Sequence, residues 1–154
     1  MQNKYHYTEC GLDNVYLING FEFVETPFGS GVHIENVDGL HRAIGKDVIE
    51  LERPLVGKEI RFLRESMDCS QRELAELLGF GDSQPILHAE RGDRSLRAAV
   101  EFTLRELYRQ HTQEGSPLEL LKLLQQLRNP ERESRLEDFD FEEVEHEWRT
   151  PITA

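Results

Sequence analysis

The chain has 154 residues, with 18 Lys and Arg against 30 Asp and Glu, so its formal net charge is −12. Because phosphates repel a negatively charged body, this composition disfavours non-specific nucleic-acid binding. With 38% hydrophobic and 31% charged residues, the chain is predicted to be globular rather than disordered. Its apolar runs fall far below the roughly 20 residues of a membrane span. No apolar signal stretch follows Met1, which predicts a cytoplasmic protein with no membrane contact.

The negative charge is unevenly distributed along the chain. Residues 1–54 carry 4 basic and 9 acidic side chains, residues 55–110 carry 9 and 10, and residues 111–154 carry 5 and 11. A nearly neutral middle between acidic flanks indicates that the segments serve different purposes. We therefore predict an α+β chain in three units: a small β-rich domain at 1–54, a helical domain at 55–112, and a Leu-rich helix with an acidic tail at 113–154.

The N-terminal unit is predicted to contain strands followed by one short helix. β-rich runs at 15–18 and 21–24 flank Asn19-Gly20, a turn dipeptide that accepts positive φ twice, and this pattern predicts a hairpin. A third strand and a helix are marked by Val32 and Ile34, then by Leu40, Ile44 and Val48. The pattern breaks at 52–54, where we expect a linker.

From Gly57 onward the apolar spacing becomes helical. A first helix carries on one face Ile60, Phe62, Leu63 and Met67. A second helix begins after Ser70, whose side chain can cap it while Glu73 completes a capping box, and it ends at Gly79.

Two more helices are expected before the last third of the chain. Asp82 is placed to cap the third helix, and Gly92 ends it. Ser95 is expected to open a longer helix whose apolar stripe runs from Leu96 to Tyr108.

The middle block resembles a known family of DNA-binding proteins. The stretches Ile60–Arg64, Ser70–Gly79 (Ser-Gln-Arg-Glu-Leu-Ala-Glu-Leu-Leu-Gly) and Ile86–Gly92, which ends Ala-Glu-Arg-Gly, are similar to the helix-turn-helix of the Cro and phage-repressor (XRE) class. The resemblance implies an all-α, repressor-like domain at 55–112 whose third helix stands in the DNA major groove. Arg64 and Glu90 match a pair that forms an internal ion pair in this family, and we expect it to be structural.

The resemblance also implies which side chains face the bases. Ser83, Gln84 and His88 match the positions that project from the third helix toward base edges. The amide of Gln84 can pair bidentately with adenine N6 and N7; its alternative role is a helix cap. His88 can donate to a guanine or a phosphate, or it is an ordinary exposed histidine.

Four residues are expected to contact the phosphate backbone: Gln71, Arg72, Arg91 and Arg94. Gln71 begins the second helix, where its amide and the free backbone N–H groups can meet a phosphate oxygen. Arg91 and Arg94 follow the recognition helix. The alternative for Gln71 and Arg72 is a solvated surface side chain.

The chain departs from the family pattern around the turn. The interval from Gly79 to Glu90 has one residue more than the usual spacing, and Gly81 is identified as the insertion. Pro85 offers no N–H to a base, and Leu87 is apolar where the family presents a polar residue, so it could touch a thymine methyl. The contact set therefore depends on how the turn is oriented.

The family binds DNA as dimers, which implies a homodimer on a pseudo-palindromic operator. The apolar stripe at 96–108 could form the dimer interface, and so could a Leu-rich helix at 118–127, which Ser116-Pro117 would open. Packing within one protomer explains either stripe equally well.

The acidic tail at 131–154 alternates carboxylates with four apolar side chains: Phe139, Phe141, Val144 and Trp148. One interpretation is a solvated or partly disordered extension. The other is a segment that folds onto a basic partner or onto its own DNA-binding face.

An N-terminal unit before a helix-turn-helix is similar to the plan of MqsA-like antitoxin regulators, whose N-terminal domain binds zinc and a toxin. A structural zinc site needs four ligands, whereas this segment offers Cys10 with the scattered His6, His33 and His41. We therefore expect no metal, and we expect Cys10 to be a buried apolar residue and Cys69 a second free thiol. A cognate toxin remains an open partner.

The sequence predicts a sequence-specific, double-stranded-DNA-binding transcriptional regulator, acting as a dimeric autorepressor or as an antitoxin. The alternative is a protein-interaction module that neutralises a basic partner protein with little DNA binding of its own. We expect no enzyme and no cofactor, because no nucleophile–base pair, phosphate-binding glycine loop or metal cluster stands out. Residues 57–94 carry 6 basic and 8 acidic side chains, which predicts a shallow salt dependence of DNA binding.

Overall fold

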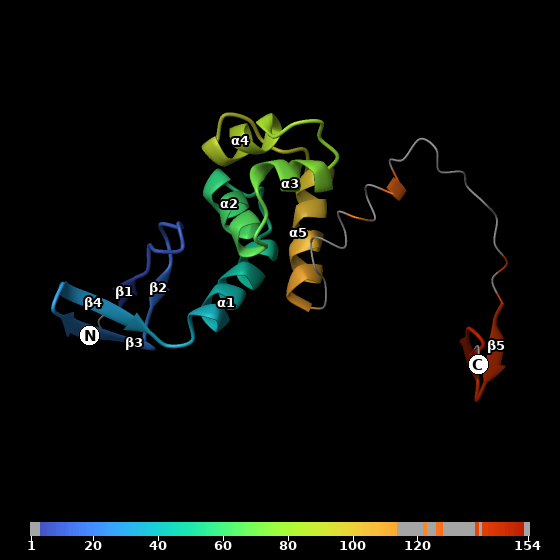
Figure 1. Ribbon diagram of the computed structural model, residues 1–154, viewed down its shortest axis with the longest axis horizontal. Helices are drawn as coiled ribbons and strands as arrows, with labels where there is room; N and C mark the ends of the chain where they lie inside the picture. The colour runs from blue at the N-terminus through green and yellow to red at the C-terminus, as the bar shows by residue number, and fades with distance from the viewer. Residues whose placement is uncertain (1–3, 114–121, 123–125, 128–137, 139, 153–154) are drawn as a thin grey trace.

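The computed structural model describes residues 4–113, 122, 126–127, 138 and 140–152. It is a mixed α and β structure in which helices follow small antiparallel strand pairs (Figure 1). In chain order the elements are β1 (Tyr5–His6), β2 (Tyr16–Leu17), β3 (Phe21–Thr26), β4 (Gly29–Ile34), α1 (Val37–Ile49), α2 (Gly57–Ser66), α3 (Gln71–Leu77), α4 (Gln84–Arg91), α5 (Ala98–Gln113), β5 (Glu142–Val144) and β6 (Glu147–Arg149). Among the described residues, no helix combines the length and apolarity needed to cross a membrane.

The predicted hairpin across Asn19-Gly20 is wrong. β2 pairs with β1, and β3 pairs with β4 over six residues, from Phe21 opposite Ile34 to Thr26 opposite Gly29. The tight β3–β4 turn favours this pairing, because Thr26 Oγ1 donates to Gly29 O at 2.6 Å and accepts from the N–H of Phe28 at 3.2 Å. The longer ladder satisfies more backbone groups than the predicted four-residue hairpin would.

The predicted helix around Leu40, Ile44 and Val48 is confirmed as α1. Its N-cap is Asn36, which adopts a left-handed φ of 47° and accepts from the N–H of Gly39 at 3.2 Å. Helix α1 packs on α5 through Gly45, where a Cβ atom would lie 1.8 Å from the hydroxyl oxygen of the buried Tyr108. The missing side chain therefore lets the two helices approach closely.

The first two predicted helices of the middle block are confirmed as α2 and α3. The capping box of α3 forms as expected: Glu73 N donates to Ser70 Oγ at 3.0 Å, and Ser70 N donates to Glu73 Oε1 at 3.1 Å. After α3 the chain turns at Gly79, whose φ is +89°. These elements follow from local signals in the sequence.

Two predicted helix starts need correction. Helix α4 begins at Gln84, so Ser83 takes the N-cap position, although Asp82 Oδ1 still accepts from the N–H of Gln84 at 2.9 Å. Helix α5 begins at Ala98 rather than at Ser95. Gly92 ends α4 with a φ of +83°. Residues 93–97 form a non-helical connection from α4 to α5.

One hydrophobic core joins the N-terminal strands to the helices. Its largest fully buried side chains come from α2, α3, α4 and α5, and they are Leu63, Leu74, Ile86 and Leu104. The same core includes Tyr7, Leu12 and Leu17 from the strand region and Val48 from α1. Contacts of α1 with both α2 and α5 therefore continue the core across the connection at 50–56.

That connection is non-helical, as predicted, and Arg105 of α5 holds it in place. The guanidinium group of Arg105 donates to the carbonyl oxygens of Ile49 at 3.2 Å, Leu51 at 2.5 Å and Arg53 at 2.7 Å, and to Glu101 Oε2 at 3.0 Å. Because one rigid planar group binds three backbone carbonyl oxygens, at residues 49, 51 and 53, the connection is held against α5.

Glu59 of α2 is a buried carboxylate at this same junction. It accepts from two guanidinium nitrogens of Arg53 at 2.9 and 2.8 Å and from the N–H of Val56 at 2.8 Å. Burial alone would raise the pKa of Glu59, but these hydrogen bonds outweigh burial and hold the pKa below its ordinary value of 4.5.

Protonation of Glu59 is therefore expected to destabilise the fold. Because its pKa is lower in the folded chain, its contribution is present above the unfolded pKa and is lost as the pH falls through the folded value. In urea titrations at successive pH values, the unfolding free energy of the wild type should fall more steeply on acidification than that of Glu59→Gln. Parallel pH profiles for the two proteins would contradict this assignment.

The tail is structured over 142–149, which corrects the expectation of a partly disordered extension there. β5 and β6 pair from Glu142 opposite Arg149 to Val144 opposite Glu147. The aromatic side chains beside them remain in solvent, with Phe141 61% and Trp148 72% exposed. The predicted helix at 118–127 and Phe139 lie largely outside the described residues.

Candidate nucleic-acid interface

Helices α2, α3 and α4 pack around small side chains. Ala75 of α3 and Ala89 of α4 are buried, and they allow close helix crossings around Leu74 and Ile86. At the start of α2, a Cβ atom on Gly57 would lie 2.2 Å from the carbonyl oxygen of Glu90. The N-terminus of α2 therefore rests on the backbone at the end of α4 and sets where α4 lies.

Arg64 of α2 and Glu90 of α4 form the ion pair that the sequence suggested. Arg64 Nε lies 2.6 Å from Glu90 Oε2, and its Nη2 lies 2.9 Å from Oε1, with the two side chains only 12% and 6% exposed. Arg64 Nη1 also donates to the carbonyl oxygen of Cys69 at 2.9 Å. Hydrogen bonding to Glu90 raises the pKa of Arg64. The pair thus ties α4 to α2 and to the loop before α3.

Gln71, expected at a phosphate, has a partner within the protein. Its amide Nε2 donates to Glu90 Oε1 at 3.3 Å, a contact that sequence reasoning missed. One amide N–H is used in this bond, and the amide carries a second N–H that this bond does not use. Its neighbour Arg72 is exposed, and its Nε lies 3.7 Å from Glu76 Oε1.

The expected base-reading residues separate into two groups. Gln84 and His88 line one hollow of about 760 Å³ between α4 and the start of α5, together with Arg94. Gln84 is exposed, and the half-buried His88 has its Nδ1 3.3 Å from Asp93 Oδ2. Ser83 does not line this hollow; it is the N-cap of α4 and is half-buried.

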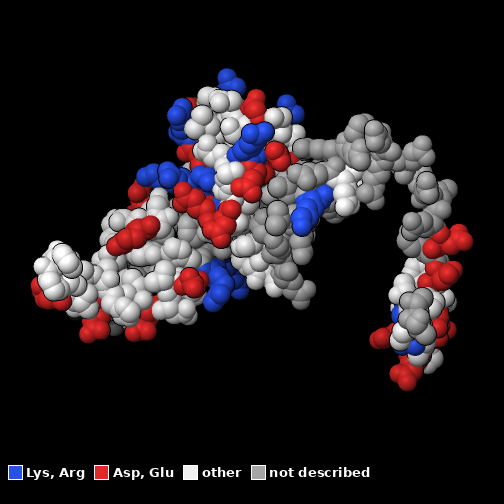
Figure 2. Space-filling view, viewed as in Figure 1, with Lys and Arg blue, Asp and Glu red and all other residues white. Residues whose placement is uncertain are grey.

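Arg97 also lines the hollow, and sequence reasoning did not single it out. The available signal was its place as the third arginine of a run with Arg91 and Arg94. All three are exposed, and within the described part of the chain their guanidinium groups form no ion pair. Figure 2 shows several separate Lys and Arg side chains around the top of the view, where α4 lies, with Asp and Glu side chains among them.

The cations elsewhere on the helices are largely neutralised. Arg61 pairs with Glu65 at 2.8 Å, and Arg105 pairs with Glu101 at 3.0 Å. Arg91, Arg94 and Arg97 place positive charge beside α4 without a paired carboxylate among the described residues, although residues 57–94 are acidic in total. This arrangement suits an interface for a few phosphates.

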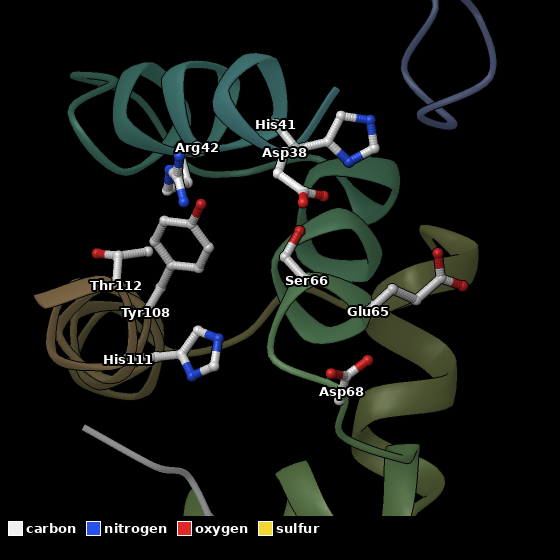
Figure 3. A pocket seen from close by; sticks show the side chains of 9 residues that line it. All are labelled: Asp38, His41, Arg42, Glu65, Ser66, Asp68, Tyr108, His111 and Thr112. Carbon is white, nitrogen blue, oxygen red and sulfur yellow. The ribbon is translucent and has the colours of Figure 1, made fainter. Parts of the chain in front are cut away.

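A second hollow, of about 450 Å³, lies between α1, the end of α2 and α5. Figure 3 shows Tyr108 and His111 of α5 facing Asp38 of α1 and Ser66 of α2 across it. His111 Nδ1 is buried and has no hydrogen-bond partner among the described residues. No group of three or more metal-ligating side chains converges in the part of the chain that the structure describes.

The four residues considered for zinc have separate partners. His6 Nε2 lies 2.6 Å from Asp13 O, and His41 Nε2 lies 2.7 Å from the hydroxyl of Tyr7. His33 lies beside Glu35, and Cys10 is a buried, free cysteine. The structure therefore does not bring them together.

Cys69, the other thiol, is also buried and free. Burial raises the pKa of this thiol, and the charges of Glu73 and Asp68 raise it further against the opposing effect of Arg64. A thiol that resists ionisation is a poor nucleophile, so Cys69 is a packing residue.

No family model, no curated protein and no solved structure matches this chain. Its function is therefore inferred from the geometry of its own residues.

Proposed function

We propose that the protein is a sequence-specific, double-stranded-DNA-binding transcriptional regulator with an XRE-type helix-turn-helix formed by α3 and α4, and that it acts as a homodimeric repressor. The single observation that carries this proposal is the arrangement on α4. Gln84, His88 and Arg91 follow one another at helical spacings of four and three residues, so they share a face. The same face borders the exposed Arg94, and the buried pair Arg64–Glu90 anchors the helix from behind.

Each of these side chains has a defined task in this proposal. The amide of Gln84 reads adenine in the major groove, and His88 donates to a base or a phosphate beside it. Arg91 and Arg94 contact phosphates, as do Arg72 and the second amide N–H of Gln71. Because few cations are unpaired, the salt dependence of binding should be shallower than for strongly basic repressors.

The dimer requires an exposed apolar surface that a second copy of the chain can cover. Leu104 and Tyr108, both part of the predicted stripe, are buried in the protomer's own core, so they are not free to form a dimer interface. Phe102 on α5 is exposed, and it is the apolar side chain of that helix that a second copy could cover.

An alternative function, the binding of a basic protein such as a toxin, is favoured by the N-terminal strands. Phe23 and Phe28 of the β3–β4 hairpin are strongly exposed, and Glu22 and Glu25 lie on the same hairpin. An apolar patch beside carboxylates suits a basic partner surface. In that function the helices would serve mainly as a scaffold.

The function is tested by selecting binding sites from a random double-stranded DNA library and measuring the affinity for the selected sites by fluorescence anisotropy. Gln84→Ala is expected to lose about 1–3 kcal/mol of discrimination at one base position. Arg91→Ala should weaken binding to all sequences. It should also reduce by about 1 the slope of the logarithm of the binding constant against the logarithm of the salt concentration. Arg61→Ala, which alters a paired cation on α2, serves as the control and should bind normally.

Two outcomes would contradict the proposal: failure to select any specific site at low salt, or unchanged binding in both Gln84→Ala and Arg91→Ala. Co-purification of a basic protein that Phe23→Ser abolishes would favour the alternative instead.

A further inference from the structure

The hollow between α4 and α5 has a composition that DNA binding does not require. Its apolar lining residues are half-buried, and they are Phe80, Pro85, Leu96 and Val100. Its charged residues are Arg94, Arg97 and the carboxylate Asp82, all of them exposed, so arginines outnumber carboxylates in the lining. Phosphates need cations and hydrogen-bond donors, whereas an apolar lining of about 760 Å³ is suited to an apolar side chain or a small ligand.

The β5–β6 hairpin carries the complementary chemistry. Trp148 of β6 is 72% exposed, it lies directly opposite Glu143 on β5, and Glu147 precedes it. Residues 142–149 hold four glutamates against Arg149, which is itself paired with Glu142 at 2.9 Å. Trp148 and Glu143 share one face of the hairpin, whereas Glu147 lies on the other face because side chains alternate along a strand. An exposed indole beside a carboxylate suits an apolar hollow that is flanked by arginines.

We propose that the β5–β6 hairpin docks on this hollow of the same chain, with the indole of Trp148 inside it and Glu143, on the same face, against Arg94 and Arg97. In the arrangement of Figure 1 the hairpin lies apart from α4, so docking brings the two together. Residues 114–141 separate α5 from β5, and a chain of this length spans up to about 90 Å. A compact domain of this size has a radius of gyration of only about 13 Å, so the hollow is within reach.

A docked hairpin would cover Gln84, His88 and Arg94, the residues assigned above to DNA. The hairpin and DNA would therefore compete for one face, and this consequence rests on the proposed function. The docking itself does not, because it depends only on the hollow and the hairpin.

Fluorescence of the full chain tests the docking, because Trp148 is its only tryptophan. The wild type at low salt should show blue-shifted emission and weak quenching by acrylamide. Arg94→Gln with Arg97→Gln should shift the emission to the red and raise the quenching constant several-fold, as should high salt. Arg61→Gln, an exposed arginine on α2, is the matched control and should leave the emission unchanged.

The docking is overturned if Trp148 is equally accessible to acrylamide in the wild type and in the double arginine variant. Blue-shifted emission that grows with protein concentration would also overturn it, because the occupant would then be a second copy. For the competition, Glu143→Gln should bind the selected DNA several-fold more tightly than the wild type. If neither protein binds DNA while the tryptophan results hold, the proposed function fails and the docking stands.

Discussion

Replacing Glu90 with alanine is expected to lower the free energy of unfolding by about 3–5 kcal/mol, because it leaves the guanidinium of Arg64 buried without its carboxylate. The side chain of Arg64 is only 12% exposed, so water replaces little of the lost interaction. Gln71 also loses its acceptor at 3.3 Å. Urea denaturation followed by circular dichroism would measure the loss, which should appear as a lower midpoint with an unchanged slope.

Two further variants test whether the lost stability comes from leaving a buried charge without its partner. Arg61→Ala removes an exposed ion pair with Glu65 and should change stability little. Arg64→Met combined with Glu90→Leu removes both charges and should recover most of the stability lost in Glu90→Ala, because no unpaired charge stays buried. If Glu90→Ala is as mild as Arg61→Ala, the pair does not hold α4 to α2.

Gly57→Ala is expected to destabilise the protein by about 1–3 kcal/mol. A Gly→Ala change at a position with ordinary φ usually stabilises a protein by about 0.4–1 kcal/mol. Here the new Cβ would lie 2.2 Å from the carbonyl oxygen of Glu90 and 2.7 Å from that of Ala89. Because both are backbone atoms at the end of α4, the clash can be relieved only if α4 moves.

The matched control is Gly81→Ala, since a Cβ at Gly81 would meet no atom within 4 Å. Thermal unfolding should show a lower midpoint for Gly57→Ala and an equal or higher one for Gly81→Ala. Under the proposed function, Gly57→Ala should also bind the selected DNA more weakly, because α4 is displaced. Equal melting temperatures for the two variants would show that α2 does not rest on α4 in this way.

The strands show where reasoning from the sequence failed. The run at 15–18 and the turn dipeptide Asn19-Gly20 are genuine local signals, yet β2 pairs with Tyr5–His6 and β3 pairs with β4. A strand shows in its own sequence that it is extended, but not which edge it will join. The rings of Tyr5, Phe21 and Phe23, 5.6–6.1 Å apart, join these two strand pairs across the N-terminal unit.

The candidate interface was predictable in part. The residues matched to the family include Arg64 and Glu90, which the structure places in contact, and Gln84 and His88, which share a hollow. Arg97 was missed because α5 begins at Ala98 rather than at Ser95, and only this later start places Arg97 on the connection that lines the hollow. The bond from Gln71 to Glu90 joins residues from different helices, so no local pattern reveals it.

The sequence by itself determined the succession of helices from Gly57 to Gly92, because caps, terminal glycines and apolar spacing act within one or two turns of chain. Only the tertiary structure decided the strand pairing, the hold of Arg105 on the connection at 50–56, and the hollow beside α4. Each of these joins residues far apart in sequence, and each depends on which of several compatible surfaces the packed chain brings together.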